Sequence, residues 1–317
     1  MVATSPVVLG LDFGGTKIAA AVCDLAGNRL ASETVGSDGA LGAEASFGRG
    51  IGLARDLLGT AAPGSELIAV GVATFGIPFE DRVELAPTIP GWDRLAMGRE
   101  LRRAFPGAQI RMATDAKAAA QAEVRWGALA GCDPAVYLNL GTGLAAAVVI
   151  GGQVVSGVNG AAGEIGYNLR LLTDVGRPLD RRLLLEQMVS GQALADRAAT
   201  AGRRLTAEDV FAAADGEFDG LIDDFAGELA FHLVNLANLV NPARIAVGGG
   251  IARSWERIRL PLKHALESGT PFPPELVVAH FPDDAPLLGA VAIAVDAAQG
   301  ADEGVVHQHP INTSTMS

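Results

Sequence analysis

A turn near the start of the chain has the composition of an anion-binding loop; it consists of Asp12, Phe13, Gly14, Gly15, Thr16 and Lys17. Glycines let backbone N–H groups approach an anion with no Cβ in the way. The carboxylate of Asp12 would repel a bare phosphate, so it fits such a loop if Mg²⁺ or a water lies between them. The alternative is an ordinary hairpin turn with a charged edge. The turn matches neither the Walker A loop nor the GxGxxG fingerprint.

Two further glycine turns follow apolar runs that we expect to be strands. They are formed by Gly141, Thr142 and Gly143, and by Gly248, Gly249 and Gly250. Each one alone is more often just a turn. Three such turns at the ends of strands favour a ligand site, because ligands of open α/β sheets bind beyond the carboxyl ends of the strands.

Three carboxylates stand where acid–base chemistry or hydroxyl binding is possible. Asp115 lies at a strand-to-helix junction, so it either caps the helix or acts as a general base that accepts a proton from a substrate hydroxyl. Glu164 lies in the glycine-rich loop GAAGEIGY and Glu186 follows three leucines. Either glutamate could accept hydrogen bonds from polyol hydroxyls. The alternative for Glu186 is a surface salt bridge.

The pattern of apolar residues indicates an α/β chain in which these groups sit at the ends of strands. We expect strands at 7–12, 18–23, 29–35, 67–74, 108–114 and 244–250, and helices at 43–60, 95–104, 116–126, 205–241 and 286–298. Residues 135–155 read strand, Gly-Thr-Gly turn, strand, Gly-Gly turn, and so nearly repeat the N-terminal hairpin. This repeat predicts two lobes that face a common cleft.

The same pattern sets the expected domain boundaries. Residues 1–115 with 286–300 form a small N-terminal lobe, residues 116–285 form a large C-terminal lobe, and residues 301–317 are a disordered tail. The helix around 224–241 carries an apolar face that we expect in the core. Its residues are Phe225, Leu229, Leu233, Leu236 and Val240.

Composition excludes several classes of function. The 317 residues are 49% apolar and only 5% aromatic, which suits an aliphatic α/β interior. The net charge of −12 would repel nucleic acid and anionic membranes. Cys23 and Cys132, the two cysteines of the chain, cannot build a disulfide framework. The first residues, MVATSPVV, lack the basic and apolar regions of a signal peptide, and no apolar run reaches the roughly 18 residues of a membrane span. We therefore expect a cytoplasmic protein.

Seven segments, in order, resemble the ROK sugar kinases (repressor, open reading frame, kinase), a branch of the actin-like, hexokinase-like ATPases. They are VLGLDFGGTKIAAAV at 8–22, IPGW at 89–92, TDAKAAAQAE at 114–123, LNLGTGLAAAVVIGGQVVSGVNGAAGEIGY at 138–167, LEQMVSGQAL at 185–194, NLVNPARIAVGGGI at 240–251 and LLGAVAIA at 287–294. The resemblance implies a two-lobed, ribonuclease-H-like fold with the active site in the cleft between the lobes. It also implies ATP and Mg²⁺ as cofactors and a homodimer.

The resemblance assigns a role to each candidate residue. Asp12 would help to place Mg²⁺ indirectly, and Asp115 would be the base that activates the primary hydroxyl of a sugar. Glu164 and Glu186 would hold ring hydroxyls, and Thr114 and Tyr167 occupy positions that touch the sugar ring. The phosphates and nucleoside of ATP would be held by Gly14, Gly15, Thr16, Lys17, Gly141, Thr142, Gly143, Gly248, Gly249 and Gly250.

Three departures from the family pattern bear on the substrate. Thr114 replaces the usual Asn, Tyr167 replaces the usual His, and the zinc motif CxCGxxGCxE is absent between Asn168 and Glu186. We therefore expect no structural zinc, because a tetrahedral site needs Cys or His ligands. We expect the loop to be held by apolar residues instead. These are Leu169, Leu171, Leu172, Leu183, Leu184 and Leu185.

The departures leave several functions open. Loss of an amide donor and an imidazole would leave hydroxyls of glucose unpaired, at about 1–3 kcal/mol each. We therefore expect a kinase for the 6-hydroxyl of glucose or of an analogue, such as a 3-amino-glucose of the kanosamine type. The alternatives are a C7-cyclitol kinase and an inactive sugar-binding protein. A repressor is disfavoured, because the first phosphate motif begins at residue 8.

Overall fold

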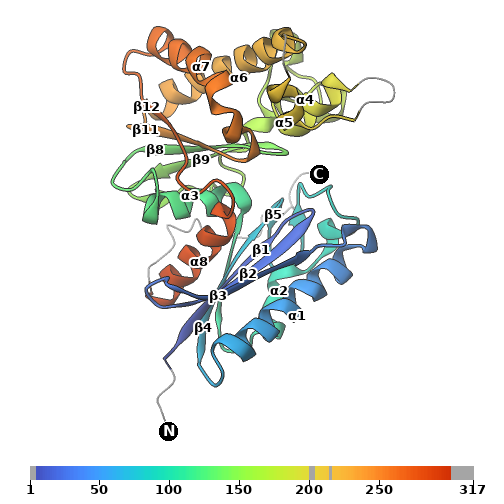
Figure 1. The fold of residues 1–317 in the computed structure, drawn as a ribbon, viewed down its shortest axis with the longest axis vertical. Coiled ribbons are helices and arrows are strands. Elements are labelled where there is room, and N and C mark those ends of the chain that lie inside the picture. Colours follow the sequence, from blue (N-terminus) through green and yellow to red (C-terminus); the bar gives the residue numbers. More distant parts are fainter. Residues whose placement is uncertain (1–4, 200–203, 214–215, 301–317) are drawn as a thin grey trace, which may run out of the picture.

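The computed structural model describes residues 5–199, 204–213 and 216–300 and contains two five-stranded sheets (Figure 1). The predicted disordered tail, 301–317, lies outside the described residues. The first sheet comprises β1 (Val7–Phe13), β2 (Lys17–Asp24), β3 (Arg29–Gly36), β4 (Leu67–Thr74) and β7 (Gln109–Thr114), in the order β3-β2-β1-β4-β7. β1 pairs antiparallel with β2 and parallel with β4.

The second sheet repeats this arrangement. It comprises β8 (Ala135–Leu140), β9 (Leu144–Ile150), β10 (Gln153–Val154), β11 (Arg244–Gly248) and β12 (Glu275–Val278), in the order β10-β9-β8-β11-β12. β8 pairs antiparallel with β9 and parallel with β11, as β1 does with β2 and β4. The predicted internal repeat is therefore confirmed as two sheets of the same strand order. A short hairpin, β5 (Ile77–Pro78) with β6 (Val83–Glu84), lies outside both sheets.

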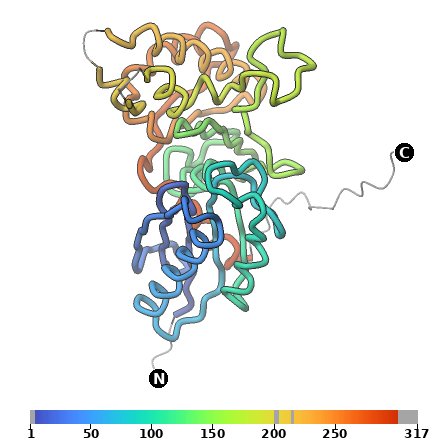
Figure 2. Tube along the Cα trace, turned by 90° about the vertical axis from the view of Figure 1, so that its right-hand side faces the viewer, coloured from blue at the N-terminus to red at the C-terminus, as the bar shows by residue number. Residues whose placement is uncertain are grey.

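Helices cover the outer face of each sheet and fill the space between the sheets (Figures 1 and 2). α1 (Ala43–Ala61) and α2 (Met97–Ala104) pack on the outer face of the first sheet. α4 (Gly191–Ala198), α5 (Ala207–Ala212), α6 (Asp219–Val240) and α7 (Trp255–Gly269) pack together beyond the second sheet. α3 (Asp115–Trp126) and α8 (Ala285–Ala298) form the layer between the sheets.

The alternation of side chains along β1 explains why this strand is apolar throughout. Val7, Leu9, Leu11 and Phe13 face α1, whereas Val8 faces α8. Successive residues of a strand point to opposite faces, so a strand buried on both sides reads as a continuous apolar run. Asp12 shares the α8 face with Val8 and so ends up at the edge of the central layer.

The two central helices cross over from one sheet to the other. α3 follows β7 of the first sheet but packs on β8 and β9 of the second, and α8 follows β12 of the second sheet but packs on β1 and β4 of the first. The division into lobes at 115/116 and 285/286 fits this exchange and stays a prediction.

The largest error in the expected elements concerns residues 205–241. The structure has two helices there, α5 and α6, instead of one. α4, α7, β5, β6, β10 as a separate strand and β12 were not predicted. The expected core face of α6 is confirmed, with Phe225, Leu229 and Leu233 fully buried and Leu236 and Val240 packed against the same core.

The described residues also form seven short 3-10 helices: η1 (Gly39–Leu41), η2 (Trp92–Arg94), η3 (Ile165–Tyr167), η4 (Leu172–Asp174), η5 (Leu179–Arg181), η6 (Leu185–Gln187) and η7 (Gly250–Ser254). No helix of the described segments is long and apolar enough to cross a bilayer.

Candidate active site between the two sheets

The first glycine turn joins β1 to β2 and is fixed by hydrogen bonds of its own backbone. The Gly14 N–H donates to the Lys17 carbonyl at 2.9 Å, and the Ser37 hydroxyl donates to the Gly15 carbonyl at 2.7 Å. A Cβ on Gly15 would lie 2.7 Å from the Thr88 methyl group, so the turn has no room for a side chain there. These contacts hold the end of β1, and with it Asp12, in one conformation.

A pocket opens beside this turn, between the β2–β3 edge and the start of α8. It is lined by Asp12, Lys17, Ala19, Arg29, Ser32, Glu33, Thr34, Asp283, Asp284 and Leu287. Arg29 forms an ion pair with Asp284 at 2.8 Å, so the pocket combines two cationic side chains with several carboxylates. Arg29 was not predicted as a site residue, because an arginine at the start of an exposed strand does not by itself indicate a binding site.

Asp12 is in an environment that disfavours its charge. Burial and the negative charge of Asp115 raise the pKa of Asp12 to about 7, against the opposing effect of Lys17. A bound cation would relieve this repulsion, and carboxylate oxygen is a ligand that Mg²⁺ prefers. Among the described residues no group of three His, Cys, Asp or Glu side chains could hold a metal ion by itself. Asp12 therefore fits the expected indirect role, in which its carboxylate would help to place a Mg²⁺ that substrate and water hold.

The second and third glycine turns lie side by side at the ends of two paired strands. Gly248 of β11 pairs with Asn139 of β8, and a Cβ on Gly249 would lie 2.5 Å from the Leu140 carbonyl group. Gly249 also has φ +84°, which favours glycine. The turn formed by Gly141 to Gly143 is thus packed directly against the turn formed by Gly248 to Gly250.

The second turn is also joined to the start of α4. The Gly191 N–H donates to the Gly141 carbonyl at 2.8 Å, and the Gln192 N–H donates to the Thr142 carbonyl at 3.3 Å. These bonds fix the turn against the end of a helix that begins at Gly191. A rigid glycine turn of this kind suits the backbone recognition of phosphate oxygens.

The helix-capping alternative for Asp115 does not hold, because Thr114 is the capping residue of α3. The Thr114 hydroxyl accepts the Lys117 backbone N–H at 3.4 Å, and Asp115 is the first helical residue. One carboxylate oxygen of Asp115 accepts the Ala116 N–H at 2.7 Å. Burial raises the pKa of Asp115, and the charge of Glu186 raises it further, whereas Lys117 lowers it.

The two predicted glutamates lie close enough to Asp115 to affect each other's charge. Burial raises the pKa of Glu164, whose carboxylate also interacts with Lys117, Asp115 and Glu186. Glu186, the middle residue of η6, accepts the Leu144 N–H at 2.9 Å, and a Cβ on Gly143 would lie 2.5 Å from the same oxygen. Glu186 is therefore held by the backbone next to the second glycine turn, and this contact stands in place of the surface salt bridge that was the alternative for this residue.

Tyr167 lies in η3, and both Glu164 and Glu186 are close enough to act on its hydroxyl. Burial raises the pKa of its hydroxyl, and the charges of Glu186 and Glu164 act in the same direction. Its carbonyl accepts a hydrogen bond from Arg182 at 2.8 Å, which ties η3 to the loop before η6. The structure thus brings together Asp115, Glu164, Tyr167 and Glu186. The Thr114 hydroxyl oxygen accepts a hydrogen bond from the first turn of α3, so its O–H can still donate to another group.

The loop 168–188 is held by polar contacts, so the prediction that leucines hold it was wrong for Leu169, Leu171, Leu172 and Leu183. These four side chains are exposed, Leu172 to 93%. Only Leu185 is fully buried. The leucines face outward because the loop lies over the surface of α6 and is fixed there by charged side chains.

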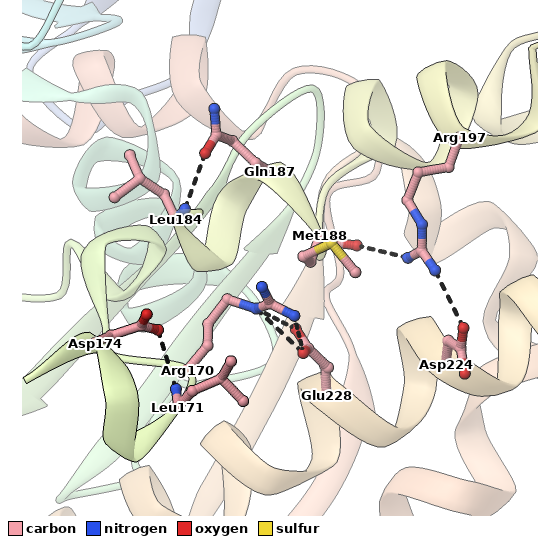
Figure 3. A network of polar contacts seen from close by, with 9 residues as sticks. All are labelled: Arg170, Leu171, Asp174, Leu184, Gln187, Met188, Arg197, Asp224 and Glu228. Atoms are coloured by element: carbon pink, nitrogen blue, oxygen red, sulfur yellow. Dashed lines mark hydrogen bonds and ion pairs between the residues drawn. The ribbon is translucent and has the colours of Figure 1, made fainter. Parts of the chain in front are cut away.

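Figure 3 shows the contacts that take this role. The Arg170 guanidinium pairs with Glu228 of α6, with its Nε 2.9 Å from Oε2. Two side chains stabilise short turns by accepting backbone hydrogen bonds. Asp174 accepts the Leu171 N–H at 3.1 Å, and Gln187 accepts the Leu184 N–H at 2.8 Å. Arg197 of α4 bridges the Met188 carbonyl and Asp224 of α6.

A sequence profile of the ROK family matches residues 8–297. A glucokinase of Halalkalibacterium halodurans is 30% identical over 285 residues, which are 82% of this chain and 85% of that protein. A kanosamine kinase of Amycolatopsis mediterranei is 32% identical over 257 residues, 78% of this chain and 82% of that protein. A ROK family glucokinase of Streptomyces griseus, solved with glucose and AMPPNP, is 27% identical with a TM-score of 0.73, and the match covers 91% of this chain and 99% of that one.

Proposed function

The chain belongs to the ROK family, and from this premise we propose that it is a sugar kinase that transfers a phosphoryl group from ATP to the primary hydroxyl of a hexose. The observation that carries the proposal is the meeting of Asp115, Glu164 and Glu186, from three separate segments, beside glycine turns at the ends of β1, β8 and β11. A carboxylate base, hydroxyl acceptors and phosphate-binding turns are the parts that phosphoryl transfer to a polyol requires.

Each residue takes a defined part in the proposed reaction. Glu164 and Glu186 accept hydrogen bonds from ring hydroxyls and orient the sugar. Asp115 accepts the proton of the sugar's primary hydroxyl while the hydroxyl oxygen forms a bond to the γ-phosphorus. At the same time the bond from the γ-phosphorus to the bridging oxygen of ADP breaks. The proton ends on Asp115, and the products are ADP and the sugar 6-phosphate. Mg²⁺, when bound near Asp12, supplies charge neutralisation for the phosphates.

For the acceptor we propose a 3-amino-glucose of the kanosamine type in preference to glucose. Asp115, Glu164 and Glu186 bring three carboxylates together, and Lys117 is the cation that acts on two of them. A positively charged amino group would balance this excess. The similarity to a kanosamine kinase at 32% identity supports the same choice, as do Thr114 and Tyr167 in place of the family's Asn and His.

A coupled ADP-release assay over glucose, mannose, N-acetylated hexosamines, 2- and 3-amino-glucose and C7-cyclitols tests both levels of the proposal. We expect turnover with hexoses and the highest kcat/KM with 3-amino-glucose. Asp115→Asn should lose about 10²–10⁴-fold in kcat, whereas Asp56→Asn, an exposed carboxylate of α1, should keep wild-type activity. Equal efficiency with glucose would contradict the amino-sugar preference, and full activity of Asp115→Asn would contradict its role as base.

A further inference from the structure

Lys117 is a buried lysine next to the proposed base, and the reaction described above leaves it without a role. It lies in α3, two residues after Asp115, and its side chain is only 6% exposed. Its ammonium group donates to the Gly160 carbonyl at 2.8 Å and lies 3.9 Å from Oε1 of Glu164. Lys117 was not among the predicted site residues, because a single lysine among the alanines of a helix is typical of a solvent-facing position.

The position of this ammonium group has a cost that its contacts must offset. Burial lowers the pKa of Lys117, and the charges of Glu164 and Asp115 oppose this change. The other titratable groups that face the same carboxylates are Glu186 of η6 and Tyr167 of η3. A buried charge persists when it is paired and hydrogen-bonded, and Lys117 meets both conditions through Gly160 and Glu164.

The hydrogen bond from Lys117 to the Gly160 carbonyl fixes a loop that also contacts the hairpin β5–β6, which follows β4 of the first sheet. Gly160 has φ +74°, and a Cβ on it would lie 2.7 Å from a methyl group of Ile77 in β5. The loop continues from Gly160 to Glu164, so a bond from α3 to its carbonyl restrains the glutamate four residues later. Lys117 thereby links Glu164 to the same helix that begins with Asp115.

Glu186 differs from Glu164 in its partners. It is held by the Leu144 N–H, and no cationic side chain pairs with it among the residues that the structure describes. Of the two glutamates, Glu164 is therefore the one whose charge is already balanced by the protein. A carboxylate that already has a cationic partner is better suited to accept a hydrogen bond from a neutral hydroxyl. A carboxylate without such a partner is better suited to pair with an ammonium group of the substrate.

Building on the proposed function, we propose that Lys117 is a positioning residue for the sugar acceptor: it holds Glu164 against α3 for a hydroxyl group and leaves Glu186 to receive a positively charged substituent. Lys117 acts through Glu164 and the Gly160 loop and does not touch the phosphoryl donor. Its loss should therefore change the KM for the acceptor and the choice between neutral and amino sugars more than the KM for ATP.

The test compares Lys117→Met, Lys117→Gln and Lys117→Arg with a control, Lys263→Met, whose side chain is 55% exposed in α7. We expect the KM for glucose to rise about tenfold or more in the Met and Gln variants, as for a lost charged hydrogen bond. The KM for ATP should stay within about twofold, and Lys117→Arg should recover part of the loss. The ratio of kcat/KM for 3-amino-glucose over glucose should increase in the Met and Gln variants, because Glu164 becomes free to pair with the substrate's ammonium group.

The outcomes separate this inference from the function on which it rests. Folding of each variant is checked by circular dichroism, and Lys117→Gln serves where Lys117→Met fails to fold. Unchanged acceptor KM and unchanged selectivity in a folded variant, beside an active wild type, overturn the inference alone. A wild-type protein that phosphorylates none of the sugars overturns the proposed function and the inference with it.

Discussion

The surroundings of Asp115 support its proposed role as base, because they bury its carboxylate and place Lys117 and the Ala116 N–H beside it. Thr114 takes the capping position of α3, and one carboxylate oxygen of Asp115 accepts the Ala116 N–H. Its bond to the Ala116 N–H and the charge of Lys117 favour the ionised form, and burial opposes it. A base used at neutral pH benefits from a pKa nearer to that pH, and burial moves Asp115 in that direction.

The raised pKa of Asp115 predicts a shifted pH dependence. The base must be deprotonated, so kcat/KM should fall as the pH drops through the pKa of Asp115, and this fall should lie above the usual aspartate range of about 3.9. The sign for stability is opposite. A folded-state pKa above the unfolded value adds stability that is present at low pH and is lost as the pH rises through the folded pKa.

Asp115→Asn should therefore unfold at a higher temperature than the wild type at pH 8, where the buried charge is costly, and the difference should shrink toward pH 4. The measurements are a pH–rate profile of the wild type and thermal unfolding of both proteins from pH 4 to 8. An acid limb near 3.9, together with equal unfolding temperatures at pH 8, would show that the environment of Asp115 is ordinary.

At the scale of the elements, α3 and α8 determine how the two halves meet. They approach so closely that a Cβ on Gly289 would lie under 3.0 Å from the Ala118 carbonyl, and a Cβ on Gly71 of β4 would meet the Ala290 carbonyl in the same way. Gly289 and Gly71 thus serve close backbone contact in the central layer. Since α3 begins with Asp115, its packing against α8 also sets the position of the proposed base.

Gly289→Ala should destabilise the protein by about 1–3 kcal/mol or more, because the new methyl group forces α3 and α8 apart. The matched control is Gly52→Ala in α1, where a Cβ would have nothing within 4 Å. That change should stabilise the protein by about 0.5–1 kcal/mol, since alanine is the better helix former. Denaturant unfolding measures both. A Gly289→Ala variant as stable as the control would mean that the two helices have room to adjust.

Features with a local cause were predictable from the sequence. The hairpin of β1 and β2, its repeat in β8 and β9, and the core face of α6 follow from apolar periodicity and glycine turns. The Arg170–Glu228 contact and the Lys117–Gly160 bond were not, because each joins residues far apart in the chain, at positions fixed only by the packing of α6 or α3. The exposed leucines of loop 168–188 were misread because hydrophobicity alone does not tell on which side of a loop a residue lies.

At the scale of the whole molecule, the proposed site is divided between two sheets of the same strand order. Asp12 and Lys17 belong to the first sheet, the second and third glycine turns belong to the second sheet, and Asp115 begins the helix that passes between them. Each half alone presents an incomplete site. Closure of two such halves over substrate would exclude water, the competing phosphoryl acceptor. The expected homodimer stays a prediction.

A divided site predicts that sugar and nucleotide stabilise the protein together more than the sum of their separate effects. Each ligand alone should raise the free energy of unfolding through the half that it contacts, by about 2.7 kcal/mol at a concentration of 100 times its Kd. When both are bound they bridge the halves, so the second ligand meets a cleft that the first has already begun to close. Thermal unfolding with the preferred sugar, AMPPNP with Mg²⁺, or both measures the coupling. Small-angle scattering should show the smallest radius of gyration when both are bound at saturation. Strictly additive stabilisation with an unchanged radius would mean that the two halves already stand in their final arrangement, and that the ligands fill a preformed site.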